Sequence, residues 1–214
     1  MPFDPAVEVI SLDRILQIVS TSKDPANKWT WKQRMLLAYK LATSMLEFHS
    51  TPWLDGKWGK HAIFFLRDQG CISSDPSVLH ASLKFEADRP FISCDVSTDP
   101  RSSSSTPSNP KACLLELGIL LLEIWHVRPF ESSATANHLT ISETYGSRYE
   151  AARRWYEDTA DNILPFYSDP VCRCIEGTFA SSSPTLVWSD LQFSKSLCEY
   201  LVKPLWENCS NKRL

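Results

Sequence analysis

Cysteine and histidine side chains are the first groups in this sequence whose chemistry invites a test, because thiolates and imidazoles are the ligands that zinc prefers. Cys71, His80 and Cys94 have that chemistry, but eight and thirteen residues separate them, which matches no compact zinc motif. Cys172 and Cys174 are two positions apart on an expected helix, so they point in nearly opposite directions. We expect Cys174 in the core and Cys172 at the surface. The sequence therefore predicts no metal site and no cofactor.

A nucleophilic hydrolase is also disfavoured. Such an enzyme needs a base beside its serine or cysteine and usually a strained turn such as G-x-S-x-G. The sequence lacks this motif. The pair His49 and Ser50 falls at the end of an expected helix, where the helix dipole favours a histidine without any catalytic role.

Trp53 and Trp58 are the aromatic residues with the most functional interest, because both fall in one glycine-containing loop. They have two interpretations. The rings cover the core from above, or they present an apolar surface to a partner, since tryptophan dominates many interfaces. We take Trp53 and Trp58 as the possible partner-binding residues.

Composition excludes several classes of protein. The chain has 214 residues, 43% of them hydrophobic, which suits a single domain over 1–214 with a sizeable core. The net charge is −3 and no basic run occurs, so a nucleic-acid binder is not expected. The longest apolar run, 113–127, contains Glu116 and Glu123 and is shorter than the ~20 residues of a membrane span. It predicts a buried helix.

The start of the chain and its cysteines indicate a cytoplasmic protein. The first residues, MPFDPAVEVI, lack the basic start and apolar centre of a signal peptide. Seven unevenly spaced cysteines favour free thiols over disulfides.

Two helices and a short strand are predicted in the first third of the chain. Ser11 caps a helix with an apolar stripe that begins at Leu12 and ends near Thr21. Thr30 and Gln33 form a capping box for a helix that reaches His49. The apolar run 62–66 predicts a strand. Two further extended pieces are expected at 82–85 and 90–94.

The middle of the chain predicts a polar loop and a central helix. Residues 97–110 are rich in serine and proline and lack large apolar side chains, which predicts an exposed loop. The segment 112–127 is apolar nearly all round, so the other elements should pack on it. Gly118 costs ~1 kcal/mol relative to alanine inside a helix. We expect another helix or backbone to approach closely there.

The last third of the chain is predicted to be helical between polar connections. A second polar loop is expected at 131–147, followed by a helix over 148–161. Ser168, Asp169 and Pro170 predict the start of the next helix. The last helix begins near Asp190, and Pro204 marks where it ends or kinks.

Two segments resemble the C-terminal lobe of protein kinases. The segment Leu37–Leu66 is similar to the long helix, catalytic loop and short strand of that lobe, and Leu114–Glu131 is similar to its hydrophobic central helix. Together they cover about forty-eight of the 214 positions. The pattern more closely resembles a fungal kinase-like domain of unknown function that often follows HeLo or prion-inhibition-and-propagation domains. The resemblance implies a mainly α, kinase-C-lobe-like fold.

The departures from the kinase pattern remove its chemistry. Phosphoryl transfer needs a catalytic aspartate, metal-binding side chains, a lysine on the phosphates and a glycine-rich cover. Lys57 stands where the resemblance places the catalytic aspartate, Ala62 where it places the metal-binding asparagine, and Cys113 at the aspartate of the central helix. The sequence has neither Asp-Phe-Gly nor G-x-G-x-x-G.

The sequence and the resemblance together predict a non-catalytic, pseudokinase-like interaction or regulatory module. The resemblance implies a role in fungal self/non-self or incompatibility signalling, with another protein or a further domain of a longer chain as partner. The alternative is an atypical metal-dependent phosphotransferase that uses Asp55 or Asp68. An enzyme should show a polar cleft with convergent carboxylates beside residues 55–68, whereas a module should show that region filled by Trp53 and Trp58.

Overall fold

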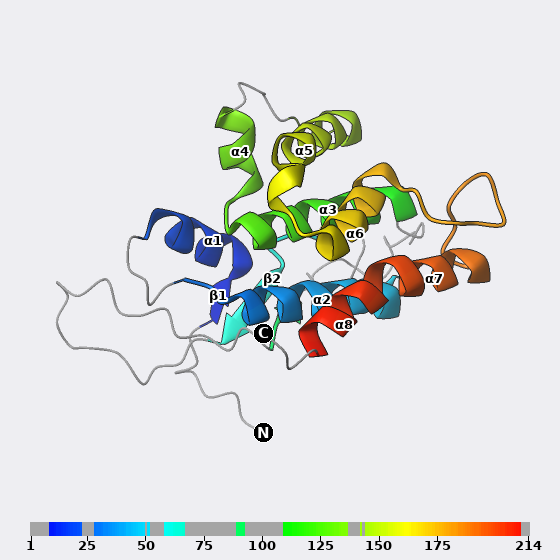
Figure 1. The fold of residues 1–214 in the computed structure, drawn as a ribbon, viewed down its shortest axis with the longest axis horizontal. Coiled ribbons are helices and arrows are strands. Elements are labelled where there is room, and N and C mark those ends of the chain that lie inside the picture. The colour runs from blue at the N-terminus through cyan, green and yellow to red at the C-terminus, as the bar shows by residue number, and fades with distance from the viewer. Residues whose placement is uncertain are drawn as a thin grey trace, which may run out of the picture.

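The computed structural model describes most of the chain and shows a mainly α fold with a small sheet (Figure 1). The described residues are 9–22, 28–49, 51, 58–66, 89–92, 109–136, 142 and 144–210. The strand expected at 82–85 and most of the serine-rich segment lie outside them. Within the described residues, the predicted mainly helical class is confirmed.

The N-terminal part supplies the sheet and two helices. Its elements are β1 (Val9–Ser11), α1 (Leu12–Thr21), α2 (Trp31–Phe48), β2 (Ile63–Leu66) and β3 (Phe91–Ile92). The strands pair antiparallel in the order β1-β2-β3. The sequence did not predict β1, because Ile10 and Ser11 were assigned only to the start of α1. Ser11 serves both elements, since it pairs with Phe64 and its hydroxyl accepts the Arg14 N–H at 3.2 Å.

The C-terminal part is helical. Its elements are α3 (Pro110–His126), α4 (Phe130–Ala136), α5 (Tyr145–Thr159), a 3-10 turn η4 (Ala160–Asn162), α6 (Pro165–Glu176), α7 (Leu191–Leu197), a π-helical turn η5 (Cys198–Val202) and α8 (Lys203–Ser210). In Figure 1, α2 lies below α3 and beside the red C-terminal helices, and α4 and α5 lie above α3.

The predicted capping box begins α2, and a cap that was not predicted begins α3. The capping box between Thr30 and Gln33 is complete, and α2 ends at Phe48 with His49 as its C-cap. The side chain of Asn109 accepts the N–H of Lys111, and Pro110 is the first residue of α3. The predicted loop 97–110 was therefore wrong in its last two positions, which belong to the cap and the helix.

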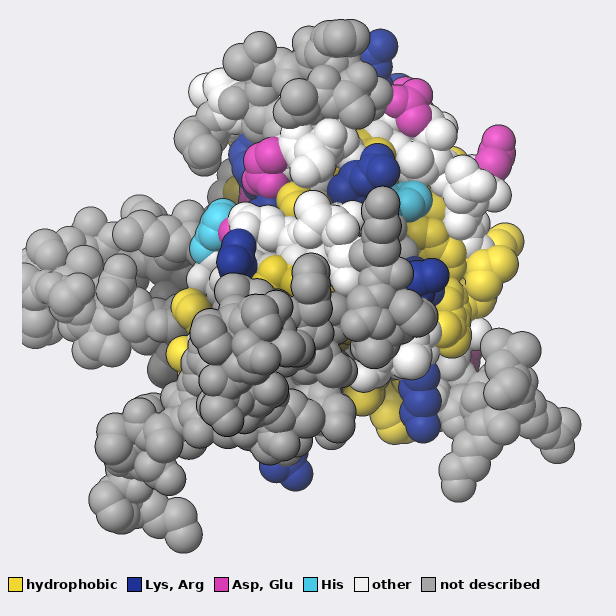
Figure 2. Space-filling model, turned by 90° about the vertical axis from the view of Figure 1, so that its left-hand side faces the viewer, with side chains coloured by type: hydrophobic (Ala, Val, Ile, Leu, Met, Phe, Trp, Pro, Cys, Tyr) yellow, Lys and Arg dark blue, Asp and Glu magenta, His cyan; other side chains and the backbone are white. Residues whose placement is uncertain are grey.

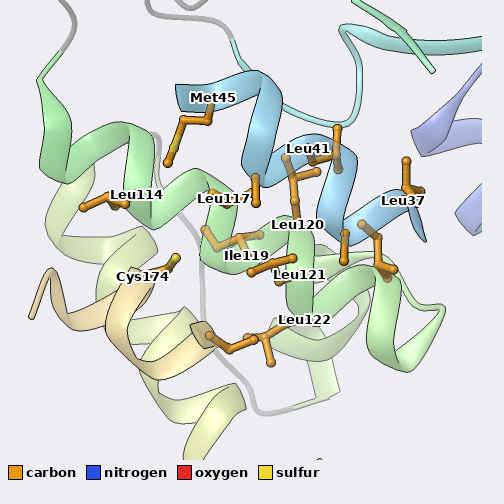
Figure 3. Close-up of a cluster of buried hydrophobic side chains, with 14 of the residues drawn as sticks. Leu37, Leu41, Met45, Leu114, Leu117, Ile119, Leu120, Leu121, Leu122 and Cys174 are labelled. Atoms are coloured by element: carbon orange, nitrogen blue, oxygen red, sulfur yellow. The ribbon is translucent and has the colours of Figure 1, made fainter. Parts of the chain in front are cut away.

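The central helix α3 is buried over most of its length, as predicted. The part from Cys113 to Ile124 is buried except at Glu116. Leucines from α3 point toward Leu37, Leu41 and Met45 of α2 (Figure 3). The buried hydrophobic side chains of the described residues form one core cluster.

Gly118 allows α6 to cross α3 at short range. A Cβ added at this position would lie 2.9 Å from Ile175 Cγ1 and 3.2 Å from the Ile175 backbone nitrogen. The expected close approach is confirmed. Cys174 is fully buried beside it and Cys172 is partly exposed, which agrees with the positions predicted for the two thiols.

Three expectations about the C-terminal helices need correction. The polar loop predicted at 131–147 contains α4 and the first turn of α5. α6 begins at Pro165 instead of Pro170, because Tyr167 is buried and donates its hydroxyl hydrogen bond to Leu121 O at 2.8 Å. Of the two outcomes predicted at Pro204, an end or a kink of the helix, the end is wrong. The π-helical turn η5 precedes that proline, and α8 continues to Ser210.

Candidate functional site

A cavity of about 540 Å³ lies between α3, the turn that precedes β2, and the starts of α4 and α5. Its size falls in the range of small-molecule sites. Charged side chains from all four segments line it, among them Lys60, Glu116, Glu123 and Arg148. The face that includes α1 and α4 shows acidic, basic and histidine side chains close together (Figure 2). We call this the Lys60 cavity.

Lys60 is a buried cation at the wall of the cavity. Its side chain is 6% exposed, and Nζ lies 2.7 Å from Glu123 Oε1 and 3.6 Å from Asp13 Oδ1. It also donates a hydrogen bond to Glu131. The Lys60 carbonyl accepts the backbone N–H of Asp13 at 3.3 Å. One ammonium group therefore joins the turn before β2 to α1, α3 and α4.

Glu123 is the most buried carboxylate of this network, at 1% exposure. Its Oε1 accepts hydrogen bonds from Lys60 and from the backbone N–H of Phe130, each at 2.7 Å. Val127, with φ of 51°, ends α3 and turns the chain so that this N–H can reach Glu123. A side chain of α3 thus caps the first residue of α4.

Burial and ion pairing shift the pKa values of the network in different directions. Burial raises the pKa of Glu123 to about 7, against the opposing effect of Lys60. At Lys60 burial favours the neutral amine, but the two glutamates outweigh it and raise the pKa of the ammonium. At Glu131 burial is outweighed by the bond to Lys60, which lowers the pKa of that carboxyl. Lys60 is therefore charged at neutral pH, and Glu123 gains or loses its proton close to neutral pH.

A second ion pair closes the other side of the cavity. Arg148 Nε and Nη2 donate to the two carboxylate oxygens of Glu116, each at 2.6 Å, in the bidentate geometry that makes such pairs strong. The guanidinium carbon of Arg148 lies 5.5 Å from the centre of the Phe130 ring, within the range of a cation–π contact.

The pairing of the carboxylates limits what the site can do chemically. Glu123 and Glu131 are bonded to Lys60, and Glu116 is bonded to Arg148, so a divalent cation would have to displace a buried ammonium or a bidentate guanidinium. In the described part of the chain, no cluster of three potential metal-ligating side chains occurs. The arrangement is suited to hydrogen bonding and charge recognition.

Only one of the residues singled out from the sequence is among the described residues at this site. Trp58 is 5% exposed, belongs to the core and also lines the Lys60 cavity. Its burial agrees with the interpretation that the ring covers the core, and partner binding by Trp58 stays a prediction. Trp53, Asp55 and Asp68 lie outside the described residues, as do the cysteines and histidine considered as zinc ligands, Cys71, His80 and Cys94.

The region beside the turn before β2 has features expected of the enzyme and features expected of the interaction module. Convergent carboxylates are present beside the turn before β2, as expected for an enzyme, but each is paired with a cation. Sequence reasoning did not identify Lys60 or Arg148 as site residues. The available signal was Glu116 and Glu123, which are acidic residues inside an otherwise apolar helix and therefore required partners.

Comparisons with known proteins identify a family and no characterised relative. A family model described as a domain of unknown function, DUF7580, matches residues 2–212. No curated protein and no solved structure matches the chain. None of the described helices is long and apolar enough to cross a membrane.

Proposed function

The chain belongs to the DUF7580 family of domains of unknown function, and we propose that it is a non-catalytic, pseudokinase-like interaction or regulatory module. The proposal includes a place in the cytoplasm and a partner that is another protein or a further domain of a longer chain. A role in fungal incompatibility signalling follows from the resemblance to kinase-like domains and is part of the same proposal.

The pairing of the buried Lys60 with three carboxylates, of which Glu123 is buried, is the observation that carries this proposal. In the kinase resemblance, the catalytic loop comes directly before the strand that is β2 here. The described end of that segment contributes Lys60, whose ammonium occupies the point where Asp13, Glu123 and Glu131 meet. In phosphoryl transfer, magnesium is usually held by one or two carboxylates, the substrate phosphates and water. A buried lysine at this point opposes metal-assisted phosphoryl transfer.

Exposed apolar side chains on the C-terminal helices support an interaction role. Leu191 is 67% exposed and Trp206 is 50% exposed, although both belong to helices that pack on the core. Trp206 lies against Tyr39 of α2, with ring centroids 5.1 Å apart. Tryptophan and tyrosine are the residues most often found at the energetic centres of interfaces.

Nucleotide binding and phosphate transfer provide the test of the non-catalytic proposal. We expect millimolar Mg-ATP to leave the melting temperature unchanged and labelled ATP to give no phosphorylated protein or peptide. Binding at 100 times the dissociation constant would add ~2.7 kcal/mol, a shift of roughly 2–4 °C for a chain of this size.

The outcome that contradicts the proposal also identifies the alternative. A melting shift of that size that disappears with EDTA and in Asp55→Asn or Asp68→Asn would favour the metal-dependent phosphotransferase. The matched control is Asp161→Asn, an exposed aspartate in η4. A shift that EDTA leaves unchanged would indicate a metal-free ligand site and would leave the module proposal intact.

A further inference from the structure

We propose that the Lys60 cavity binds a small neutral molecule whose carbonyl oxygen accepts a hydrogen bond from Trp58 Nε1 and whose apolar body occupies the rest of the cavity. This inference goes beyond the proposed function, because it assigns a ligand to the module. It is tested by observing the Trp58 indole directly, whereas the proposed function is tested with nucleotide and metal, so the two proposals can fail separately.

The indole N–H of Trp58 is a hydrogen-bond donor without an acceptor. Trp58 is 5% exposed and lines the cavity directly before the turn that leads into β2. Its Nε1 is buried and has no hydrogen-bond partner in the part of the chain that the structure describes. An indole nitrogen can only donate, and leaving a buried donor unsatisfied costs free energy. A ligand oxygen bonded to Nε1 would recover that free energy on binding.

The charged side chains of the wall, unlike Trp58, already have partners of opposite charge. Glu123 accepts a hydrogen bond from Lys60 at 2.7 Å, and Glu116 accepts two from Arg148 at 2.6 Å. A charged ligand would have to compete with one of these pairs, whose separation leaves a charge without its partner. A neutral acceptor leaves both pairs in place. The wall therefore favours a carbonyl oxygen over a carboxylate, a phosphate or an ammonium group.

Apolar side chains in the wall suit the body of such a molecule. Leu115, Ile119 and Leu120 line the cavity from α3, and the Phe130 ring lines it from α4. The cavity volume of about 540 Å³ falls in the ~300–1,000 Å³ range of small-molecule sites. Such sites combine a mostly apolar lining with a few polar groups that fix the orientation of the ligand. Trp58 Nε1 would supply the orienting group here.

Two-dimensional ¹H–¹⁵N NMR of the indole groups in the full chain provides the direct test. Acetophenone is the probe, because it has one carbonyl acceptor, one apolar ring and no charge. The Trp58 indole resonance is identified by its absence in Trp58→Phe, which keeps an aromatic ring and removes the N–H. We expect acetophenone to move this resonance downfield and saturably, at roughly millimolar concentration, as the new hydrogen bond forms. The resonance of Trp206, half-exposed on α8, should stay in place.

Three molecules of similar shape separate the effect of the carbonyl from that of the ring. Ethylbenzene lacks the oxygen, benzoate carries a negative charge, and 1-phenylethylammonium carries a positive charge. We expect each to bind more weakly than acetophenone and to leave the Trp58 resonance without a downfield shift. Trp58→Phe should weaken acetophenone binding about three- to tenfold and leave ethylbenzene binding unchanged. Trp206→Phe is the matched control and should change neither affinity.

A second variant keeps the test decisive if Trp58→Phe fails to fold. Ala112 is a half-buried residue of α3 that lines the cavity, and Ala112→Phe places a ring there without removing any member of the Lys60 network. The indole resonance that acetophenone moves in the parent should then stay in place. Ala112→Ser, which adds one atom, should retain the shift.

Four results would overturn the proposal. The first is that acetophenone moves no indole resonance, which would mean that no carbonyl ligand reaches Trp58. The second is that ethylbenzene moves the Trp58 resonance as far as acetophenone does. The third is a shift that persists in Ala112→Phe, which would place the binding outside the cavity. The fourth is tighter binding of benzoate or 1-phenylethylammonium than of acetophenone, which would assign a charged ligand to the cavity.

Discussion

Lys60 illustrates how a buried charge is maintained by groups that are remote in sequence. Its partners come from positions 13, 123 and 131, so three helices and one turn must be in place before the ammonium is stabilised. Removing one partner of such a pair usually costs more than the pair itself contributes, because an unpaired charge remains buried. The lysine is therefore a sensitive probe of the cavity.

We expect Lys60→Met to destabilise the protein by about 3 kcal/mol, because Glu123 would lose its partner while buried. The double variant Lys60→Met/Glu123→Leu should recover more than half of that loss. Urea unfolding of the four proteins of this cycle measures the effect. Lys195→Met, at an exposed lysine of α7, serves as control and should change stability by less than ~0.5 kcal/mol. A Lys60→Met variant as stable as its parent would contradict the role of the network.

Because His126 is largely buried, we expect the protein to lose stability in mild acid. Burial, with Arg128 and Arg34 nearby, lowers the pKa of His126 from 6.5 to about 4 in the folded protein. The unfolded chain therefore binds a proton between pH 6.5 and pH 4 that the folded protein refuses, and stability falls as the pH is lowered through this window. The contribution is at most about 3 kcal/mol.

Urea unfolding at pH 7 and at pH 4.5 measures the contribution of His126. In His126→Gln, which can retain the contact with the Thr159 hydroxyl seen at 3.1 Å, the decrease in stability between the two pH values should be smaller than in the parent. The same decrease in both proteins would show that other groups account for the acid sensitivity.

At the scale of elements, α3 depends on a close crossing with α6. A Cβ added at Gly118 would lie 2.9 Å from Ile175 Cγ1, and its contact with the Ile175 backbone nitrogen would leave little room for adjustment. Alanine normally stabilises a helix by ~1 kcal/mol relative to glycine. Here the overpacking, which typically costs 1–3 kcal/mol, should exceed that gain.

We therefore expect Gly118→Ala to lower the melting temperature, and Gly118→Leu to lower it much further. Gly146, in the first turn of α5, has no atom within 4 Å of an added Cβ. Gly146→Ala is thus a matched control that should leave the melting temperature unchanged or raise it. Thermal unfolding followed by circular dichroism distinguishes the two sites. A Gly118→Ala variant that melts above its parent would mean that α3 and α6 can separate without cost.

The start of α4 shows why an element can escape prediction. Its seven residues are too few for a clear apolar period, and the residue before Phe130 is a proline with no capping side chain. Glu123 supplies the missing cap from the preceding helix. Because that contact depends on how the chain turns after α3, it has no local signature in the sequence.

At the scale of the whole molecule, α2 joins the two halves of the chain. It packs against both α3 and α8, and both of these follow the serine-rich segment in sequence. Leu37, Leu41 and Met45 of α2 are fully or almost fully buried in this arrangement. A single break between α2 and α3 should therefore leave the fold associated.

Limited trypsin digestion tests this expectation. The composition of residues 97–110 predicts cleavage at Arg101 before other sites. The two fragments should then separate on a denaturing gel and elute together from a sizing column. Cleavage elsewhere first would contradict the interpretation of this segment as an exposed loop. Fragments that elute apart would contradict the packing of α2 against α3 and α8.

The sequence by itself determined the elements whose signals are local. The cap at Ser11, the capping box at Thr30 and the continuous apolar character of α3 all follow from neighbouring residues and from helical periodicity. Gly118 inside that helix predicted a close approach, but not that α6 makes it. The sequence also showed that Glu116 and Glu123 were unusual in a buried helix. It gave no means of finding their partners.

Only the tertiary structure decided which residues meet at the Lys60 cavity. Glu123 pairs with a lysine 63 positions earlier, and Glu116 pairs with an arginine 32 positions later. Such pairs form because a buried charge must find a partner among the groups that folding brings near it, whatever their separation along the chain. The start of α6 was decided in the same way, since burial of Tyr167 outweighed the local signal at Pro170.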